Sequence, residues 1–332
     1  MKKKLIAMLL SAAMCLSLAA CGQKADTPDT TDPAEPSGDA ATYTVGICQL
    51  VQHEALDAAT QGFIDALNEA LPGQVKIEEK NASGDSNSCA TIVNGFVSEG
   101  VDLIMANATA ALQAAASATS DIPVLGTSIT AYGVALDIDD FSGTVGGNVS
   151  GTSDLADLSK QADMITEWFP ETQKVGLLFC SAEPNSRYQI DEVRKALEAQ
   201  GVTCEEFAFT DSNDVSSVAQ KAADFSDVVY IPTDNTAASN TEAIANVLIP
   251  AGVPAICGEE GLCRGCGVAT LSISYYDLGV TTGKMAAKIL TGEADISEMP
   301  IEYFQNPVKK YAAERCAALG IEIPSDYVAI EG

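Results

Sequence analysis

Short polar runs in this chain carry the residue types that could hold a small charged molecule. Each follows a stretch of apolar, β-forming residues, and the runs are 49–54, 107–109, 127–128, 181–186, 233–236 and 258–260. The carboxylates of Glu183, Asp234 and Glu259 could accept hydrogen bonds from an ammonium group. Asn, Ser and Thr at helix starts bring free N–H groups and a positive dipole end, which favour an anion. These residues are also common N-caps, so it is their convergence that favours a site for a zwitterion.

The sequence lacks the short motifs that most often accompany catalysis. No GxSxG, HExxH, GxGxxG or GK(S/T) motif is present, and His53 is the single histidine. The neighbouring acids Glu259 and Glu260 could serve a glycosidase, but as a loop pair they suit hydrogen bonding or capping better. Cys263 and Cys266 form a lone CxxC without a fourth zinc ligand nearby. We therefore expect no catalytic residue, no cofactor and no metal.

Strands that alternate with helices must position the polar runs. In the first half, β-forming residues predict strands at 43–47, 75–81, 101–106 and 122–125. Apolar residues at helical spacing predict helices at 55–67, 86–99 and 110–119. Because parallel strands end at one edge of a sheet, the polar runs should meet at that edge.

The second half repeats this rhythm. Strands are predicted at 174–180, 202–209, 227–231, 253–257 and 268–273, and helices at 155–169, 185–199, 215–225, 236–248 and 276–290; 301–305 and 308–319 complete it. Residues 140–152 are rich in Gly and Ser without periodicity, as in a crossover between lobes. The fold class that follows is α/β, with two doubly wound parallel-sheet lobes joined by crossover hinges. A cleft between such lobes is a favoured ligand site.

The N-terminal segment has the pattern of an export signal followed by an anchor. A basic start precedes apolar residues 5–18, a stretch too short for a comfortable membrane span. It ends in Leu18-Ala19-Ala20-Cys21, which resembles a bacterial lipobox and predicts a signal peptide of residues 1–20 and lipidation of Cys21. Residues 21–42 have almost no apolar bulk and are expected to be a disordered tether. The folded part should lie outside the cytoplasm, anchored to the cell membrane through Cys21.

Composition and charge narrow the choice of partners. The chain has 332 residues, of which 47% are hydrophobic and 19% charged, and its net charge is −28. Such a negative charge argues against nucleic acid and against an anionic membrane surface as partners. Beyond Cys15 and Cys21, the irregular spacing of the cysteines predicts free or loosely paired thiols, and Cys180 and Cys204 could face each other across neighbouring strands.

Several motifs, taken together and in order, resemble one known family. They are Gly46-Ile47 with residues 53–57 (HEALD), 102–104 (DLI) with 108–109 (AT), 148–154 (NVSGTSD), 183–186 (EPNS), 232–236 (PTDNT) and 275–279 (YYDLG). The chain is similar in this way to the tryptophan/tyrosine-uptake (TrpX-like) substrate-binding proteins of ABC transporters over nearly all of residues 43–327. Two places depart from the pattern, namely Thr130 to Gly133, where relatives commonly have an Asp-Pro turn, and Cys263 to Cys266.

The resemblance implies a periplasmic-binding-protein-like fold of type I, with a ligand closed between lobes that move about hinges. The implied ligand is an amino acid, often aromatic, with Tyr132, Tyr188 and Tyr275 as possible stacking partners. We expect lobe one at 43–150 plus 275–298, and lobe two at 151–274 plus 299–332. The implied partner is an ABC permease, and the protein is expected to be a monomer. A sensory receptor with the same cleft, coupled to a signalling partner, and an extracytoplasmic enzyme on the same fold remain alternatives.

The expected ligand contacts come from the polar runs and are Gln49, His53, Glu54, Ala108, Thr109, Thr127, Ser128, Glu183, Asn185, Ser186, Asp234, Asn235 and Glu259. Among them, Asp234 is the expected acceptor for an ammonium group. The expected carboxylate contacts are Thr109, Ser128, Asn185 and Ser186. Gln49 and His53 are expected to form a polar wall.

Overall fold

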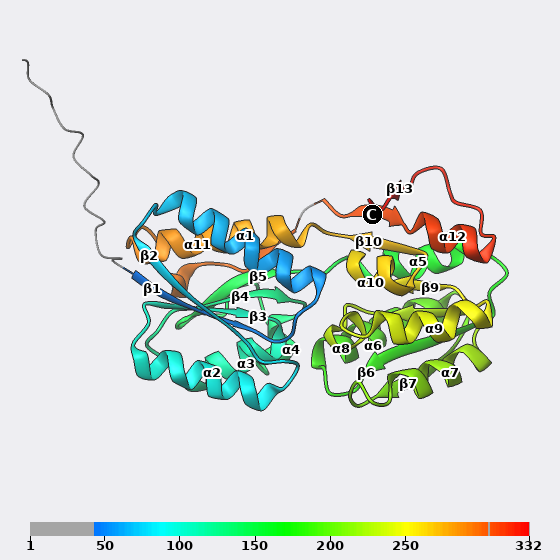
Figure 1. Cartoon of the computed structure of the whole chain (residues 1–332), viewed down its shortest axis with the longest axis horizontal. Helices are drawn as coiled ribbons and strands as arrows, with labels where there is room; N and C mark the ends of the chain where they lie inside the picture. The colour runs from blue at the N-terminus through cyan, green and yellow to red at the C-terminus, as the bar shows by residue number, and fades with distance from the viewer. Residues whose placement is uncertain (1–42, 305, 332) are drawn as a thin grey trace, which may run out of the picture. The chain divides into compact units, whose positions relative to one another are not determined.

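The computed structural model describes residues 43–304 and 306–331, which form two α/β lobes (Figure 1). Lobe one is built on a sheet in the order β11-β5-β4-β3-β1-β2, all parallel. Its strands are β1 (Tyr43–Gln49), β2 (Val75–Asn81), β3 (Leu103–Asn107), β4 (Val124–Ile129), β5 (Val149–Ser153) and β11 (Glu302–Tyr303). Its helices are α1 (Glu54–Ala70), α2 (Ser86–Glu99), α3 (Thr109–Ala118), α4 (Tyr132–Ala135), α11 (Tyr275–Leu290) and the 3-10 turn η1 (Ile296–Glu298).

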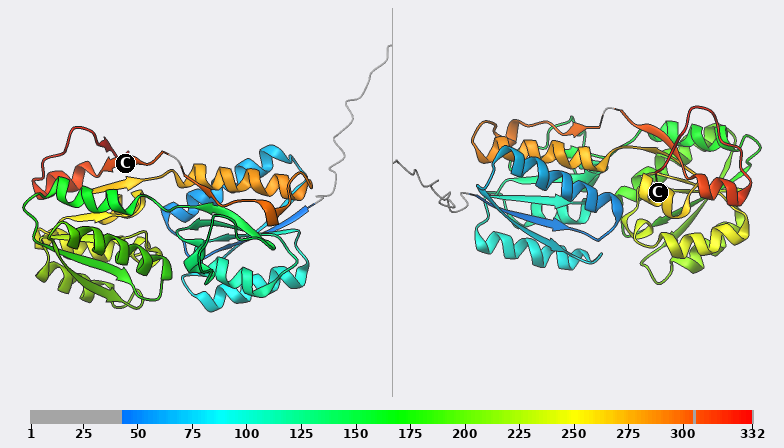
Figure 2. Two further views of the ribbon diagram at one scale, coloured as in Figure 1. Left: turned by 180° about the vertical axis from the view of Figure 1, so that it is seen from behind. Right: turned by 45° about the horizontal axis from the view of Figure 1, so that its top comes forward.

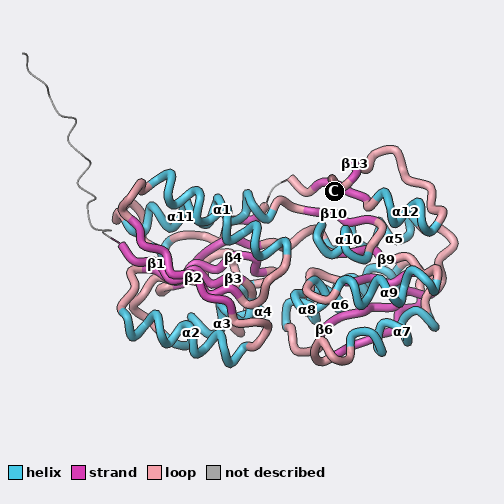
Figure 3. Tube along the Cα trace, in the orientation of Figure 1, coloured by secondary structure: helices cyan, strands magenta, loops and turns pink. Residues whose placement is uncertain are grey.

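Helices cover both faces of this sheet, and β1 shows why its sequence is apolar throughout. Val45 and Ile47 pack with residues of α1 and α11 on one face. Cys48 packs with residues of α2 and α3 on the other face. Figure 3 shows the strands lying between the two helix layers. A strand buried on both faces cannot alternate apolar with polar residues, which explains the continuous apolar run.

Two glycines allow α1 and α11 to touch along their backbones. A Cβ atom at Gly279 would lie 1.9 Å from the carbonyl oxygen of Ala59, and one at Gly62 would lie 2.1 Å from that of Tyr276. Only glycine leaves room for this approach. The contact holds α11 on lobe one, as the family resemblance implies, and places Tyr275 at the edge where the strands end.

Lobe two has a sheet in the order β13-β12-β10-β9-β8-β6-β7. Its strands are β6 (Lys174–Cys180), β7 (Thr203–Phe209), β8 (Val228–Ile231), β9 (Ala255–Cys257), β10 (Ala269–Ser272), β12 (Val308–Tyr311) and β13 (Val328–Ala329). Only the β10–β12 pair is antiparallel among the strand pairs of the described residues. The helices are α5 (Leu158–Trp168), α6 (Pro184–Ala199), α7 (Val215–Phe225), α8 (Asn235–Ala238), α9 (Thr241–Ala251), α10 (Glu260–Cys266) and α12 (Ala313–Leu319).

The chain crosses between the lobes from β5 to α5, from β10 to α11 and from β11 to β12 (Figure 2). The expected lobe boundaries at 150 and 299 are therefore wrong, because β5 runs to Ser153 and β11 pairs with β5 in the sheet of lobe one. The Gly/Ser-rich sequence hides β5, yet its small residues are required there. A Cβ atom at Gly151 would lie 2.0 Å from the carbonyl oxygen of Gly126.

Other elements also differ from the sequence-based expectations. The helix expected at 236–248 is two helices, α8 and α9, separated at Ser239 and Asn240, and the loop expected after β9 contains α10. Cys180 and Cys204 do not face each other, because Cys180 lies opposite Phe209 and Cys204 opposite Val175 in the β6–β7 register. The cysteines of the described residues are free thiols, as expected.

Candidate ligand-binding cleft

The ends of the parallel strands of both lobes meet around one small polar cavity, here called the central cavity. Its lining residues are His53, Leu56, Ser128, Thr130, Asp154, Asn185, Thr233, Asp234, Asn235, Ala238, Glu259 and Tyr275. The free volume is about 10 Å³, which is room for one water-sized group. The lobes are therefore closed on each other, and a larger molecule can enter only when they separate.

Three polar atoms of this lining are buried without a hydrogen-bond partner in the described chain. They are His53 Nδ1, Ser128 Oγ and Asp154 Oδ1. A buried polar atom without a partner costs free energy, so native proteins nearly always pair such atoms with protein, water or ligand. Three of them around one cavity indicate that a polar group of a ligand belongs there.

Asp154 lies at the first crossover, directly after β5, and is 5% exposed. Its Oδ2 accepts a hydrogen bond from Tyr275 Oη at 2.9 Å, which joins the first crossover to the second. Burial raises the pKa of Asp154 above its usual value, whereas the hydroxyl groups of Tyr275 and Thr130 act to lower it. No Lys or Arg lines the cavity, whereas Asp154, Asp234 and Glu259 do. A carboxylate in this setting is stabilised by a cation.

Ser128 owes its position to a strained backbone at the end of β4. Its φ angle is 56°, and the β4–β5 register shifts between Gly126 and Ile129. Ala108, at the start of α3, has φ 88° and ψ 159°, a region normally restricted to glycine. The Ala108 amide donates to the Thr127 carbonyl oxygen at 3.1 Å, so the two strained turns are tied together. Strain of this kind collects at functional sites.

His53 joins the lobes directly. It precedes α1 in lobe one, and its Nε2 lies 3.2 Å from Oδ1 of Asn235 in lobe two. Burial lowers the pKa of His53 below its usual 6.5, although Asn235 and the acids Glu183 and Asp57 act in the opposite direction. The imidazole is therefore neutral at neutral pH.

Asp234 lines the central cavity, but its oxygens already have partners within lobe two. Oδ1 accepts from the Ala237 amide at 2.8 Å and so caps α8. Oδ2 accepts from the Cys180 amide at 2.6 Å and from Ser186 Oγ at 2.7 Å. Burial and the nearby Glu183 raise the pKa of Asp234 to about 8. Asp234 and Ser186 therefore hold β6, α6 and α8 together.

Glu183 and Glu259 also serve as local hydrogen-bond acceptors. Glu183 accepts from the backbone amides of Asn235 at 3.0 Å and Thr236 at 2.8 Å. Glu259 caps α10 by accepting from the Gly261 amide at 2.6 Å and the Leu262 amide at 2.5 Å. Burial raises the pKa of Glu259 to about 7. Of the two, only Glu259 lines the central cavity.

The remaining expected contacts lie away from the central cavity. Gln49 donates to Asp57 at 2.7 Å and accepts from Thr60 at 2.6 Å, which fixes the start of α1. Thr127 Oγ1 lies 3.2 Å from Thr152 Oγ1 inside lobe one. Ala108 and Thr109 are buried at the start of α3. The cavity thus collects His53, Ser128, Asn185, Asp234, Asn235 and Glu259 from the expected set, but not Gln49, Glu54, Ala108, Thr109, Thr127, Glu183 or Ser186.

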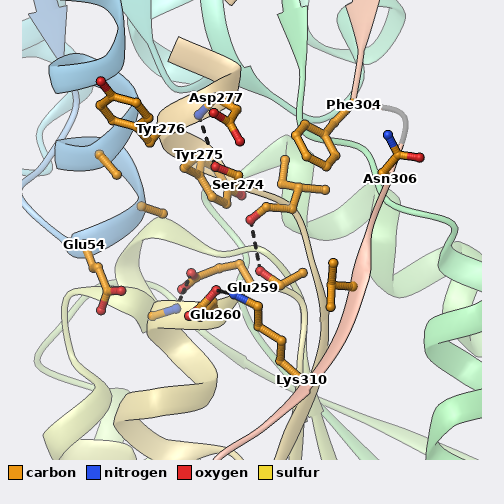
Figure 4. Close-up of a pocket in the computed structure, with 16 residues that line it drawn as sticks. Glu54, Glu259, Glu260, Ser274, Tyr275, Tyr276, Asp277, Phe304, Asn306 and Lys310 are labelled. Carbon is orange, nitrogen blue, oxygen red and sulfur yellow. Dashed lines mark hydrogen bonds and ion pairs between the residues drawn. The ribbon is translucent and has the colours of Figure 1, made fainter. Parts of the chain in front are cut away.

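Larger cavities flank the central one. On the hinge side, a cavity of about 360 Å³ shares Glu259 and Tyr275 with it (Figure 4). Glu54 lines this hinge-side cavity and forms an ion pair of 2.9 Å with Arg264 of lobe two. On the other side, a chamber of about 210 Å³ shares Asn235 with the central cavity. No residue of the crossovers lines this second chamber, which has residues of both lobes in its lining.

The list of expected ligand contacts omitted the lining residues Asp154, Thr130 and Thr233, although Thr233 lies in the polar run 233–236. Asp154 ends the NVSGTSD motif that contributes to the family resemblance, but it follows the Gly/Ser-rich stretch 140–152 and belongs to none of the polar runs. Among the tyrosines considered for stacking, Tyr275 lines the cavity. Tyr132 is a core residue instead, since its hydroxyl donates to the Gly126 carbonyl oxygen at 3.0 Å.

A two-lobed α/β architecture with a closed polar cavity between the lobes is suited to binding a small solute. The model of the ABC transporter substrate binding protein family matches residues 44–327, and the chain belongs to that family. The protein is thus the solute-binding component of an ABC transporter, and the absence of enzymatic activity is confirmed at the level of the family. Within residues 43–304 and 306–331, no helix is both long and apolar enough to cross a membrane.

Two proteins at about 30% identity to this chain are known with their ligands. A tyrosine-binding protein of Clostridioides difficile is 30% identical over 306 residues, which cover 90% of this chain and 87% of that protein. An ABC domain from Streptococcus pneumoniae, solved in complex with L-Trp, is 32% identical with a TM-score of 0.82, covering 86% of this chain and 97% of that one. Sugar-binding proteins at 14% identity share only the fold, which is of the type I class that the sequence predicted.

A third relative shows which lobe arrangement this structure has. The ligand-free, open structure of a substrate binding protein from Clostridium difficile is 33% identical, with a TM-score of 0.66, and covers 87% of this chain and 100% of that one. The L-Trp complex has nearly the same identity but the higher TM-score of 0.82. Sequence divergence therefore does not explain the difference between the two TM-scores. The lower similarity to the open structure agrees with the closed central cavity of this protein.

Proposed function

We propose that this protein binds an amino acid with an aromatic side chain in the interlobe cleft and delivers it, as a monomer, to an ABC permease. The observation that carries the proposal is the buried, unpartnered Oδ1 of Asp154 in a cavity that Ser128 and His53 also line with unpartnered atoms. An ammonium group supplies both the charge and the N–H donors that these atoms lack. The tyrosine-binding and L-Trp-bound relatives support the choice of an aromatic amino acid.

The ammonium is assigned to Asp154 rather than to Asp234. Both oxygens of Asp234 already accept hydrogen bonds from lobe two, whereas Asp154 has one oxygen free. Asp154 also couples ligand binding to the hinge, because its other oxygen accepts a hydrogen bond from Tyr275 of the second crossover. A ligand that neutralises Asp154 would favour the closed arrangement of the lobes.

Calorimetric titration of the purified protein with L-tyrosine, L-tryptophan and L-phenylalanine tests this function. The protein should first be unfolded and refolded to remove carried-over ligand. At a hundred times its Kd, a bound amino acid should add about 2.7 kcal/mol of stability and raise the melting temperature by roughly 5–10 °C.

The matched control is the des-amino acid of the same ligand, for example 3-(4-hydroxyphenyl)propionate for tyrosine. It should bind at least about a hundredfold more weakly, because a buried charge pair is lost. Equal binding of both compounds would remove Asp154 as the recognition element. Binding of sugars or nucleosides only would overturn the assignment of an amino acid.

We also propose that lipidated Cys21 anchors the protein to the outer face of the cell membrane. The lipobox-like residues 18–21 lie outside the described residues and support this proposal from the sequence alone. Replacing Cys21 with alanine should move the protein from the membrane fraction to the culture medium or the periplasm, because one residue carries the whole attachment. Replacing Cys15 in the same way should leave it in the membrane fraction. Membrane retention of the Cys21→Ala variant would contradict lipidation there.

A further inference from the structure

The side-chain amide of Asn235 has only one possible orientation. Its Nδ2 lies 2.7 Å from Oε2 of Glu183. A carboxylate accepts hydrogen bonds, so the amide nitrogen must be on the Glu183 side. Glu183 is itself fixed by the backbone amides of Asn235 and Thr236. The carbonyl oxygen Oδ1 of Asn235 consequently faces His53.

This orientation fixes the tautomer of His53. Nε2 lies 3.2 Å from the Asn235 carbonyl oxygen and must carry the hydrogen. A neutral imidazole has a single N–H group, so Nδ1 carries a lone pair and acts as an acceptor. Nδ1 is buried without a partner in the described chain, and His53 lines the central cavity. Nδ1 therefore lacks a hydrogen-bond donor.

Three unmatched atoms then surround a space of one water-sized group. Asp154 Oδ1 and His53 Nδ1 can only accept, and Ser128 Oγ can accept. A primary ammonium group has three N–H donors, and it is the size of the free volume of about 10 Å³. We propose that His53 Nδ1 accepts a hydrogen bond from the third N–H group of the ammonium and thereby selects primary amino acids over N-methylated and imino acids. This inference rests on the proposed function, because it requires an ammonium group at Asp154.

Two substitutions separate the nitrogen atoms of His53. In His53→Gln, the amide nitrogen overlaps Nε2 and can still donate to Asn235, but nothing replaces Nδ1. In His53→Asn, the shorter amide places an acceptor near Nδ1 and loses the contact with Asn235. A role in joining the lobes predicts that His53→Asn is the more damaging variant. If His53 Nδ1 instead recognises the ammonium group, His53→Gln should lose part of its selectivity for the amino acid over the N-methyl derivative.

The experiment measures the affinity of the wild-type protein and both variants for two ligands. One is the amino acid that binds most tightly among tyrosine, tryptophan and phenylalanine, and the other is its N-methyl derivative. In the wild type and in His53→Asn, N-methylation should weaken binding by about tenfold or more, because a buried acceptor is left unpaired. In His53→Gln this penalty should shrink to roughly threefold or less, because no acceptor remains there.

The pH dependence of affinity gives a second result that a packing role would not produce. Glu183 and Asp57 face His53 and act to raise its pKa, but burial outweighs them and lowers it. Asp154, Asp234 and Glu259 also line the cavity. Burial raises the pKa of each of these carboxyl groups, so each stays protonated to a higher pH than usual. When the pH falls through the lowered pKa of His53, protonation turns Nδ1 into a donor that opposes the ammonium group. Wild-type affinity should then fall more steeply with acidification than that of His53→Asn, which has no imidazole.

Each outcome decides a different question. If no amino acid binds, the proposed function fails and this inference fails with it. If an amino acid binds but N-methylation has the same cost in the wild type and in His53→Gln, the amino-acid function stands and His53 does not read the ammonium group. A reduced cost in His53→Gln together with a retained cost in His53→Asn establishes the role of Nδ1.

Discussion

Replacing Asp154 with asparagine is expected to abolish amino-acid binding while the protein stays folded. The substitution keeps the shape of the side chain and the hydrogen bond from Tyr275, but removes the charge that pairs with the ammonium group. Loss of a buried, hydrogen-bonded charge pair should weaken affinity by at least about a hundredfold, or roughly 3 kcal/mol. Calorimetric titration with tyrosine or tryptophan measures this directly.

The ligand-free Asp154→Asn protein should be at least as stable as the wild type at neutral pH. Burial raises the pKa of Asp154 in the folded protein. Ionisation of Asp154 therefore destabilises the folded state as the pH rises through that raised pKa. Asparagine has no ionised form, and its advantage should vanish in acid, where Asp154 is protonated in both the folded and unfolded states. Weaker ligand affinity together with equal or higher stability would show that the variant has lost a ligand contact and that its fold is intact.

The matched control is Asp157→Asn, three positions along the chain. Asp157 caps α5, accepting from the Lys160 amide at 3.3 Å, and its side chain is 43% exposed. Asparagine caps a helix about as well as aspartate, so this replacement should change stability by about 0.5 kcal/mol or less and leave affinity unchanged. If Asp154→Asn bound the ligand within about threefold of the wild type, the buried charge pair would be excluded.

Replacing Asp234 with alanine should, unlike Asp154→Asn, cause a large loss of stability. The carboxyl group accepts from the amides of Cys180 and Ala237 and from the hydroxyl of Ser186. Alanine leaves all three buried donors without a partner, at about 1–3 kcal/mol for each group that water cannot reach. We expect a total loss of roughly 3–4 kcal/mol, and a melting temperature lower by about 6–12 °C in a calorimetric scan.

Asp214→Ala is the control for this second prediction. Asp214 also precedes a helix, α7, but its side chain makes no capping hydrogen bond and is exposed. Its removal should change the melting temperature by about 1 °C or less. A melting temperature of Asp234→Ala equal to that of Asp214→Ala would show that the Asp234 hydrogen bonds do not hold lobe two together. It would also return Asp234 to consideration as the ammonium contact.

The sequence predicted the periodic elements well and the irregular ones poorly. The bounds of β2, β6, α2 and α7 agree with the expectation, because each has clear apolar spacing between polar or glycine boundaries. The strand β5 and the helix α10 were missed, since Gly, Ser and Cys give little periodic signal. Their place in the fold depends on neighbouring strands and on close backbone contacts, which are tertiary effects.

The candidate site was predicted in location but only partly in detail. The polar runs do meet at the strand ends, as parallel strands require. Sequence cannot tell an acid that caps a helix from an acid left free for a ligand, and Asp234 and Glu259 turned out to cap α8 and α10. Asp154 is the reverse case, an acid in an unpromising crossover whose second oxygen the fold leaves unpaired.

The close packing of α1 on α11 has a consequence for how the chain acquires its structure. Tyr276 donates to Asp65 at 3.0 Å across 211 positions of sequence. Gly62 packs against the backbone of Tyr276, and Gly279 packs against the backbone of Ala59. Lobe one therefore cannot close its core until almost the whole chain has left the ribosome or the export channel. The central strands of lobe two, by contrast, follow one another without interruption from β6 to β10. Long-range closure is slow, so we expect lobe two to form first and the apolar face of α1 to remain exposed to chaperones and proteases until α11 arrives.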